Sequence, residues 1–350
     1  MDKVRIGIVG CGGMARSHAS RFSMILDKVE LSAVCDIIIE RAQSVAELLP
    51  NEPLVTPDYR EMYDHVDAVL LVLPHHLHYQ ATLDFLRAGK HVLVEKPMAN
   101  SEQECREMIQ CAKDCDRVLM VAYCMRFHPL ALKMKELIDN KTYGEVFQLS
   151  MWTEQLTQYP PDHWASSAKT LGGGQLFSHG CHYIDLMLWM LGKPVWGTHF
   201  GTNSGTPWME REGTSNVTIE FEGGVMGYHM GTWGARGTRL RYSFHAHCTE
   251  GMIEAAISKG QLILHSKHAI HDPDKPNAPQ NEQILLEIPN AKPTEVEMAH
   301  FVECIRTGQK PLTDPVGSLE GLQVIWKLYE AEETHQLADL HGMGLGSLAL

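Results

Sequence analysis

Two residues of this chain, Lys96 and His182, are of types that can transfer a proton or stabilise a developing negative charge. Lys96 follows the apolar run His91-Val92-Leu93-Val94, and Pro97 ends that run because proline has no N–H to donate to a sheet. His182 lies far along the chain in a glycine-rich stretch. A histidine that titrates near neutrality can accept a hydroxyl proton. A lysine at the same oxygen can stabilise alkoxide character, or take the proton if burial lowers its pKa.

A glycine turn near the amino terminus has the spacing expected of a nucleotide-binding loop. The run Gly10-Cys11-Gly12-Gly13-Met14-Ala15 stands between a predicted strand over 4–9 and a predicted helix that ends near Leu26. Gly10 permits a tight turn, Gly12 lets the backbone approach a pyrophosphate, and Ala15 allows close packing of helix on strand. We predict cofactor contacts at Gly10, Gly12, Gly13 and Met14.

Asp36 ends a second predicted strand, over 31–35, where an acidic side chain can bind the adenosine ribose. A carboxylate there repels a 2′-phosphate, and Ile37 and Ile38 offer no group to receive one. We therefore predict NAD as the cofactor. Two alternatives stay open. Asp36 could instead cap a helix over 39–49, and Arg41 leaves open a dual specificity for NAD and NADP.

Strands and helices alternate through the rest of the first 124 residues, which predicts a parallel sheet. We expect strands at 54–55, 68–73, 91–94 and 118–121, and helices at 58–63, 75–88 and 101–115. Ligands of such sheets bind outside the carboxyl ends of the strands. Four residues should therefore lie at the cofactor edge, namely Pro74, His78, Glu95 and Lys96. His75, His76 and His78 have no carboxylate or cysteine at ligand spacing, so we predict no metal site.

Composition excludes several classes of partner. The 350 residues are 44% apolar and carry a net charge of −13, without a basic stripe that would favour nucleic acid or an anionic membrane. No signal-peptide pattern follows Met1, and the longest apolar run, 68–73, is too short to span a bilayer. Nine cysteines without CxxC spacing read as reduced thiols. We expect a cytoplasmic protein.

The pattern changes after residue 124, where a second domain is predicted over 125–340, with a tail at 341–350. A helix is expected at 130–138, followed by sheet segments at 146–152, 217–221, 225–233, 240–247 and 252–254. The polar stretch 266–281 is predicted to be a loop, and helices are predicted at 294–306 and 318–335. The glycine-rich end, 342–350, is either a disordered tail or an oligomer contact.

Several of these motifs together resemble the Gfo/Idh/MocA family, named for glucose–fructose oxidoreductase and inositol dehydrogenase. They are the glycine turn, the strand ending in Asp36, Pro74 with His78, and above all Glu95-Lys96-Pro97. The resemblance implies an α/β protein with an amino-terminal Rossmann domain and a carboxy-terminal α+β domain built on a large, mostly antiparallel sheet. It also implies nicotinamide-dependent chemistry on sugars or cyclitols, with Lys96 contacting the substrate hydroxyl and the nicotinamide ribose.

The same resemblance extends to the junction and to the assembly. Arg126-Phe127-His128-Pro129 is similar to the family's arginine-aromatic-x-proline junction, and we expect Arg126 near the substrate. Relatives commonly bury the open face of the second sheet between subunits. The resemblance therefore implies a homo-oligomer, a dimer or tetramer, formed through that face.

The stretch from Gly172 to Asp185 resembles the family signature GGGxLxDxGxHxxD, in which the histidine is the usual acid/base. That role falls to His182. This chain departs from the pattern at Ser178, where the family has aspartate, and His179 stands beside it. Either His179 replaces the lost function, or His182 and Lys96 work without an acidic partner. On an α-helix, Ser178 and Asp185 would share a face with His182, so we expect Ser178 near the substrate.

An aromatic loop precedes the glycine run and is a candidate substrate loop. Within 155–164 the aromatic and polar side chains suit a sugar, which has apolar C–H and polar O–H surfaces. We name His163 and Trp164 as the expected contacts. Trp233, Arg236 and Arg239 lie on a second loop that could close over the first.

Three hypotheses follow for function. The first is an NAD-dependent dehydrogenase acting on a secondary hydroxyl of a sugar, glycoside or cyclitol. The second is a redox-neutral enzyme that oxidises a glycoside to a keto-sugar, breaks the glycosidic bond by β-elimination and regenerates its NAD. The third is a non-catalytic NAD-sensing protein, against which the retention of both Lys96 and His182 counts.

Overall fold

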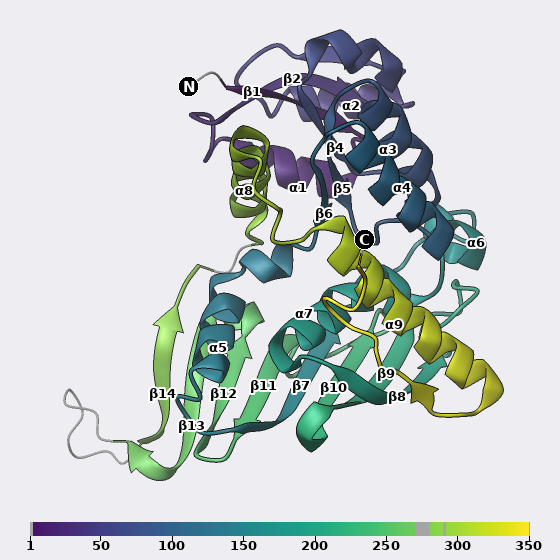
Figure 1. Cartoon of the computed structure of the whole chain (residues 1–350). Coiled ribbons are helices and arrows are strands. Elements are labelled where there is room, and N and C mark those ends of the chain that lie inside the picture. The colour runs from purple at the N-terminus through teal and green to yellow at the C-terminus, as the bar shows by residue number, and fades with distance from the viewer. Residues whose placement is uncertain (1–2, 271–279, 290–291, 350) are drawn as a thin grey trace. The chain divides into compact units, whose positions relative to one another are not determined.

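The computed structural model describes residues 3–270, 280–289 and 292–349, which form two compact units (Figure 1). The first unit contains residues 1–127, 169–172 and 293–319, and the second contains 128–168, 173–292 and 320–350. Each unit is built on its own sheet. The predicted α/β class, with one parallel and one mostly antiparallel sheet, is confirmed.

The first unit holds a six-stranded parallel sheet in the order β3-β2-β1-β4-β5-β6. The central strand Ala68–Leu71 is fully apolar and buried, as expected for a sheet whose two faces are both covered by helices. The strands are β1 (Val4–Val9), β2 (Val29–Cys35), β3 (Leu54–Thr56), β4 (Ala68–Leu71), β5 (His91–Glu95) and β6 (Leu119–Ala122). The order reverses beside β1, so the carboxyl ends of β1 and β4 border the crevice where ligands of doubly wound folds bind.

Helices of the first unit pack their apolar sides on this sheet. They are α1 (Gly13–Phe22), α2 (Ile39–Ala46), α3 (His78–Arg87), α4 (Glu102–Asp114) and α8 (Thr294–Thr307), with short 3₁₀ turns at Tyr59–His65, His75–Leu77 and Cys124–Phe127. Ser101 caps α4 by accepting from the N–H of Glu104. Helix α8 contributes Phe301 to the core that also holds Phe22 of α1. The late helix α8 is therefore a structural part of the first unit.

The second unit contains nine strands in the order β14-β13-β12-β11-β7-β10-β9-β8-β15. All neighbours are antiparallel except β7 and β10, which run parallel. The strands are β7 (Val146–Glu154), β8 (Pro194–Thr202), β9 (Thr214–Phe221), β10 (Val225–Thr232), β11 (Tyr242–Cys248), β12 (Gly251–Ala256), β13 (Gln261–Ile270), β14 (Gln280–Glu287) and β15 (Ala338–Asp339). Alternate residues such as Leu149, Ile219 and Phe244 are fully buried on one face.

Three helices belong largely to this second unit: α5 (Pro129–Asp139), α7 (Cys181–Leu191) and α9 (Pro315–Thr334). In Figure 1, α5 and α7 lie in front of the sheet, and their buried residues complete its core. Shorter turns of this unit lie at Trp164–Ser166, Glu222–Gly224 and Ile257–Lys259, whereas the short helix α6 (Ala168–Leu171) belongs almost wholly to the first unit. The opposite face of the sheet carries side chains such as Trp152 and Tyr228, which are half-buried.

The structure corrects three sequence-based expectations. The predicted loop over 266–281 is wrong at its ends, because β13 extends to Ile270 and β14 begins at Gln280; residues 271–279 lie outside the described part. The segment Leu176–Gly180 forms a π-helical turn, so Ser178 does not stand on an α-helix with His182. The end of the chain is not a free tail, because Glu320 accepts from the N–H groups of Gly346 and Leu348.

All nine cysteines are free thiols, and every one except the half-buried Cys115 is buried. Burial raises the pKa of Cys11 and of Cys35 to about 12. Among residues 3–270, 280–289 and 292–349, no helix is both long and apolar enough to cross a bilayer.

Candidate active site

Lys96 directly follows β5 in the first unit, and the surrounding backbone is braced by His78. The imidazole of His78 is fully buried, with Nδ1 2.9 Å from the Pro97 carbonyl oxygen and Nε2 2.9 Å from that of Leu73. Burial lowers the pKa of His78, which favours the neutral ring with a single N–H. Only one of the two contacts is therefore a hydrogen bond at neutral pH. His78 ties the segment after β5 to the end of β4.

Glu95, the last residue of β5, holds Lys96 from the other side. Its Oε1 lies 2.8 Å from Nε2 of His18 on α1, and its Oε2 accepts from the backbone N–H of Lys96 at 3.3 Å. Both Glu95 and His18 are buried. Sequence reasoning missed His18, because nothing in the local pattern of α1 distinguishes it from a packing residue.

The glycine turn fits the pyrophosphate of a dinucleotide. Gly10 has φ +88°, and a Cβ there would lie 2.3 Å from the Val72 carbonyl oxygen, so only glycine is tolerated. A Cβ at Gly12 or Gly13 would meet nothing within 4 Å, which leaves the start of α1 open to a ligand. No side chain caps that helix end.

Asp36 hydrogen-bonds to the backbone of the same turn. Its carboxylate accepts from the N–H of Cys11 at 2.8 Å and from that of Ile38 at 2.9 Å, just before α2 begins. Asp36 does not cap α2, because the N-cap residue is Ile38 and no side chain caps that helix end. The bond to the N–H of Ile38 instead closes a local turn, and each carboxylate oxygen retains a second lone pair for the predicted ribose contact. Ile37 is 88% exposed beside it and offers nothing to a 2′-phosphate.

In the second unit, a buried Tyr329–Glu212 pair fixes the turn that leads to His182. The Tyr329 hydroxyl donates to Glu212 at 2.6 Å and accepts from the N–H groups of Gly174 and Phe177. A Cβ at Gly174 would lie 2.1 Å from the Glu212 carboxylate, which explains a glycine at this position. Burial raises the pKa of Glu212. The π-helical turn and α7 start from this anchor, and His182 on α7 is 7% exposed.

His179 lies at the centre of a hydrogen-bonding network. Its Nδ1 is 3.4 Å from the side-chain nitrogen of Gln175, and its Nε2 is 3.3 Å from the hydroxyl of Tyr242, which donates to Gln155. An amide N–H at Nδ1 and a phenol oxygen at Nε2 favour the tautomer with its proton on Nε2. Gln155 lies in the predicted substrate loop and Gln175 in the predicted signature stretch, but sequence reasoning missed Tyr242.

The rings of His179 and His182 approach within 6.3 Å at nearly a right angle. Ser178, beside them, is 4% exposed, and its backbone carbonyl accepts from the thiol of Cys181. The structure therefore brings together the predicted Ser178, His179 and His182 within the second unit. Whether His179 replaces the family aspartate stays a prediction.

The predicted substrate loop forms a continuous series of aromatic contacts. The His163 ring stacks on Tyr159 at 4.0 Å, while its Nδ1 accepts from the N–H of Ala165 and caps the turn Trp164–Ser166. Tyr159 meets Trp208 edge-on at 5.4 Å, and Trp208 lies parallel to Trp233 at 6.2 Å. Trp233 in turn lies 6.5 Å from His179. Trp208 was missed because its strand-to-strand loop carries no recognisable motif.

The remaining predicted residues belong to the first unit. Pro74, His78, Glu95 and Lys96 lie at the carboxyl ends of β4 and β5, and Arg126 is buried in the 3₁₀ turn Cys124–Phe127. His75, in the turn before α3, contacts the Leu171 carbonyl oxygen at 2.8 Å, and burial lowers its pKa far below the ordinary value. In the described part of the chain, no three histidine, cysteine or acidic side chains are grouped so that they could hold a metal ion.

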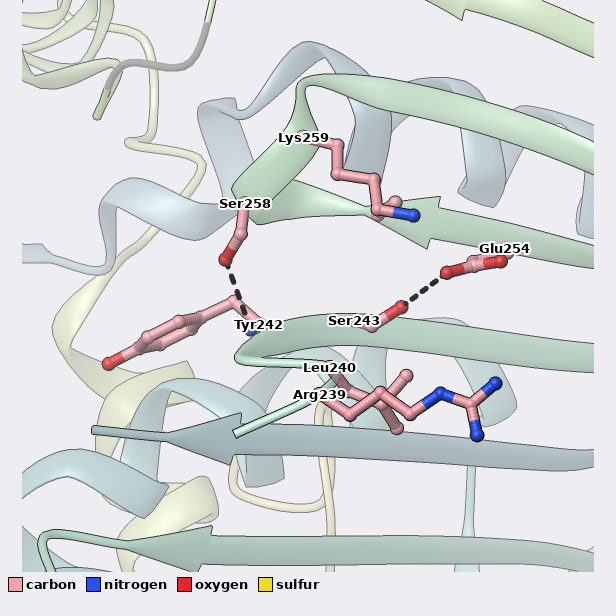
Figure 2. A pocket seen from close by; sticks show the side chains of 8 residues that line it. Arg239, Leu240, Tyr242, Ser243, Glu254, Ser258 and Lys259 are labelled. Carbon is pink, nitrogen blue, oxygen red and sulfur yellow. Dashed lines mark hydrogen bonds between the residues drawn. The ribbon is translucent and has the colours of Figure 1, made fainter. Parts of the chain in front are cut away.

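A small pocket lies on the second sheet beside the His179 network. Figure 2 shows Tyr242 on one side of it and Ser243 bonded to Glu254 on the other, with Arg239 and Lys259 extending from neighbouring segments. The nearby His245 ring, 3.7 Å away, contributes most to lowering the pKa of Glu254 to about 2, and hydrogen bonds with His265 and Ser243 add to the effect. The pocket therefore carries a stable carboxylate, and Tyr242 links its wall to His179.

Two family models match this chain. The first, described as "Oxidoreductase family, NAD-binding Rossmann fold", matches residues 4–123, and the second, "GFO/IDH/MocA C-terminal domain", matches residues 131–254. The chain belongs to the Gfo/Idh/MocA family. The predicted membership is thereby confirmed, and the first unit is an NAD-binding Rossmann domain.

Curated proteins similar to this Gfo/Idh/MocA chain act on sugars and cyclitols. D-glucoside 3-dehydrogenase of Escherichia coli (strain K12) is 32% identical over 55% of this chain and 55% of its own length. The NAD(+)-dependent scyllo-inositol 2-dehydrogenase of Bacillus subtilis (strain 168) is 25% identical over 92% of each chain. The match to several such relatives, the first included, spans only about half of their length.

Solved structures share the fold over nearly the whole chain. Levoglucosan dehydrogenase in complex with NADH superposes with a TM-score of 0.84 at 20% identity, covering 97% of this chain and 99% of that one. Aldose-aldose oxidoreductase from Caulobacter crescentus gives 0.82 at 24% identity, covering 97% and 100%. At these identities the likeness concerns the fold alone.

Proposed function

We propose that this protein is an NAD-dependent dehydrogenase that oxidises a secondary hydroxyl of a sugar, glycoside or cyclitol. The observation that carries the proposal is Lys96 at the carboxyl end of β5, braced by Glu95 and His78, in a Rossmann domain with an open glycine turn. The activities named for the similar curated proteins support the substrate class.

In this proposal Lys96 and His182 share the work on the reacting hydroxyl. Lys96 hydrogen-bonds its oxygen and stabilises alkoxide character, while His182 accepts the proton. Gly10, Gly12, Gly13, Met14 and Asp36 would hold the cofactor, with Pro74 and His78 at its edge. Bound NAD supplies the acceptor for the hydride that leaves the substrate carbon. His163, Trp164, Arg126 and Ser178 are the proposed substrate contacts.

Replacing Lys96 tests the proposal most directly. The Lys96→Ala protein should lose about 100-fold or more of kcat, because no other group would stabilise the alkoxide. NADH absorbance with a panel of sugars, cyclitols and glycosides measures the loss, and a separate titration should show that NAD binding persists. Lys113→Ala, which removes an exposed lysine on α4, is the matched control. Full activity of the Lys96→Ala protein would remove Lys96 from the mechanism.

The redox-neutral cleavage of glycosides remains the second candidate, and Ser178 favours it. Serine at position 178 removes the negative charge that the family's aspartate would carry four residues before His182. The product decides between the two reactions. Cleavage of a glycoside without net NADH would favour the redox-neutral cycle, and a stable ketose formed together with stoichiometric NADH would exclude it.

We further propose that the protein works in the cytoplasm as a homo-oligomer. The nine free thiols support the compartment, since oxidising compartments convert such residues to disulfides. The assembly is supported by the uncovered face of the second sheet, where Met226 is 40% exposed and Phe200 72% exposed.

A further inference from the structure

Three buried titratable side chains form a cluster behind Lys96, entirely within the first unit. They are His18 of α1, Glu95 at the end of β5, and Glu297 in the first turn of α8, and their residues are 2%, 8% and 0% exposed. Glu95 bonds His18 through one carboxylate oxygen and the backbone N–H of Lys96 through the other. Its carboxylate therefore connects α1 to the proposed catalytic lysine.

Glu297 completes the charge arrangement of this cluster. Neither of its carboxyl oxygens has a partner among the described residues. Burial, and then the negative charge of Glu95, raise the pKa of Glu297 well above its ordinary value. A protonated Glu297 avoids a second buried negative charge beside the Glu95 carboxylate, which lowers the desolvation cost of the group.

The elements that carry the cluster are locked to one another. Arg21 of α1 bonds Glu295 of α8 at 3.3 Å, and Phe22 and Phe301 from the same two helices share one apolar core. Helix α1 begins at Gly13 in the glycine turn, and β5 ends at Glu95. Buried partners on rigid elements of this kind orient the groups that contact a substrate.

We propose that His18 and Glu297 are positioning residues for Lys96. His18 bonds the carboxylate of Glu95, and Glu95 bonds the backbone N–H of the lysine. Glu297 is fully buried on helix α8, which is bonded to the helix that carries His18. Both residues are buried, so they act on the reaction through Glu95. The inference rests on the proposed function, because it requires Lys96 to act on the substrate hydroxyl.

A double-mutant cycle tests this role. His18→Leu should lower the single-turnover rate of hydride transfer by about 10- to 100-fold in the otherwise natural protein. In the Lys96→Ala background it should cause no further loss, because the residue through which it acts is gone. The dissociation constant of NAD should change by less than about threefold. Equal losses in both backgrounds, or an equal loss of NAD affinity, would overturn the positioning role.

Conservative variants keep the test decisive if His18→Leu folds poorly. Glu297→Gln, the neutral isostere, should retain more of the hydride-transfer rate than Glu297→Ala, and His18→Gln more than His18→Leu. Amide variants no better than the apolar ones would contradict the proposal. His65→Gln, an exposed histidine on the turn Tyr59–His65, is the control. Absence of NADH formation by the natural protein with every sugar, cyclitol and glycoside tested would overturn the proposed function, whereas the cycle alone overturns this inference.

Discussion

At the scale of single residues, Glu297 is expected to make the free energy of unfolding fall as the pH rises. Because its pKa is raised in the folded state, the folded chain binds a proton that the unfolded chain releases above its ordinary pKa near 4.5. The contribution of Glu297 to the free energy of unfolding is therefore complete below about pH 4.5. It is lost as the pH rises toward the pKa that Glu297 has in the folded state.

The Glu297→Gln protein should lack this loss, because an amide does not titrate. Its free energy of unfolding relative to the natural protein should rise by about 1.4 kcal/mol per pH unit above pH 4.5, until the folded pKa is reached. Urea unfolding followed at several pH values between 4 and 8 measures the difference. A constant difference across that range would show that Glu297 is already ionised in the folded state.

Sequence patterns locate the residues of the site far better than they locate the partners of those residues. Lys96 was recognised because Glu95-Lys96-Pro97 is a contiguous motif after an apolar strand. The partners His18 of Glu95 and Tyr242 of His179 are set by the packing of segments that are distant in sequence. No local periodicity encodes such contacts, so a single sequence could not have revealed them.

At the scale of elements, the hydroxyl of Tyr329 connects α9 to the turn in front of α7. This hydroxyl donates a hydrogen bond to Glu212 and accepts hydrogen bonds from two backbone N–H groups, and all of these groups are buried. Tyr329→Phe fills the same space but leaves these groups without their partner. We expect a loss of about 1–3 kcal/mol in the free energy of unfolding, together with a lower kcat, because the support for the helix that carries His182 loosens.

Urea unfolding and steady-state kinetics check both effects of the Tyr329 change. Tyr79→Phe is the matched control, since the hydroxyl of Tyr79 reaches only the exposed Glu107 on the surface. It should change stability by less than about 0.5 kcal/mol. Equal effects of the two substitutions would mean that the buried hydroxyl has no special role.

The elements of the first unit were predictable because βα alternation leaves a strong signal, and each of its strands overlaps a predicted one. The second unit was harder. The strands β8, β13 and β14 were missed because their residues alternate too weakly or lie in polar stretches. The π-helical turn at Leu176–Gly180 was also not predicted, because its sequence pattern does not distinguish a π-helical turn from an α-helix.

At the scale of the whole molecule, the uncovered face of the nine-stranded sheet predicts self-association. Cross-strand register places Met226, Tyr228 and Met230 beside Gln148, Ser150 and Trp152 on that face. An exposed sheet face with this many large side chains is costly in a monomer. Light scattering after size-exclusion chromatography should give a multiple of the 39.3 kDa chain mass.

Tyr228→Arg should shift this assembly toward the monomer, because a buried interface would have to accommodate an unpaired charge. Leu132→Arg, at an exposed position on helix α5, is the control and should leave the mass unchanged. A strictly monomeric natural protein would contradict the proposal of an oligomer.

The burial of the cysteines determines how readily the protein reacts with oxygen and with thiol reagents. Eight of the nine thiols are shielded from oxidants and alkylating reagents as long as the core stays closed. Any event that opens the core releases several nucleophiles at once, at pKa values that return to their ordinary range. Damage by oxygen is thus coupled to unfolding, and the first irreversible step of ageing is expected to be a disulfide between chains that have already lost their fold.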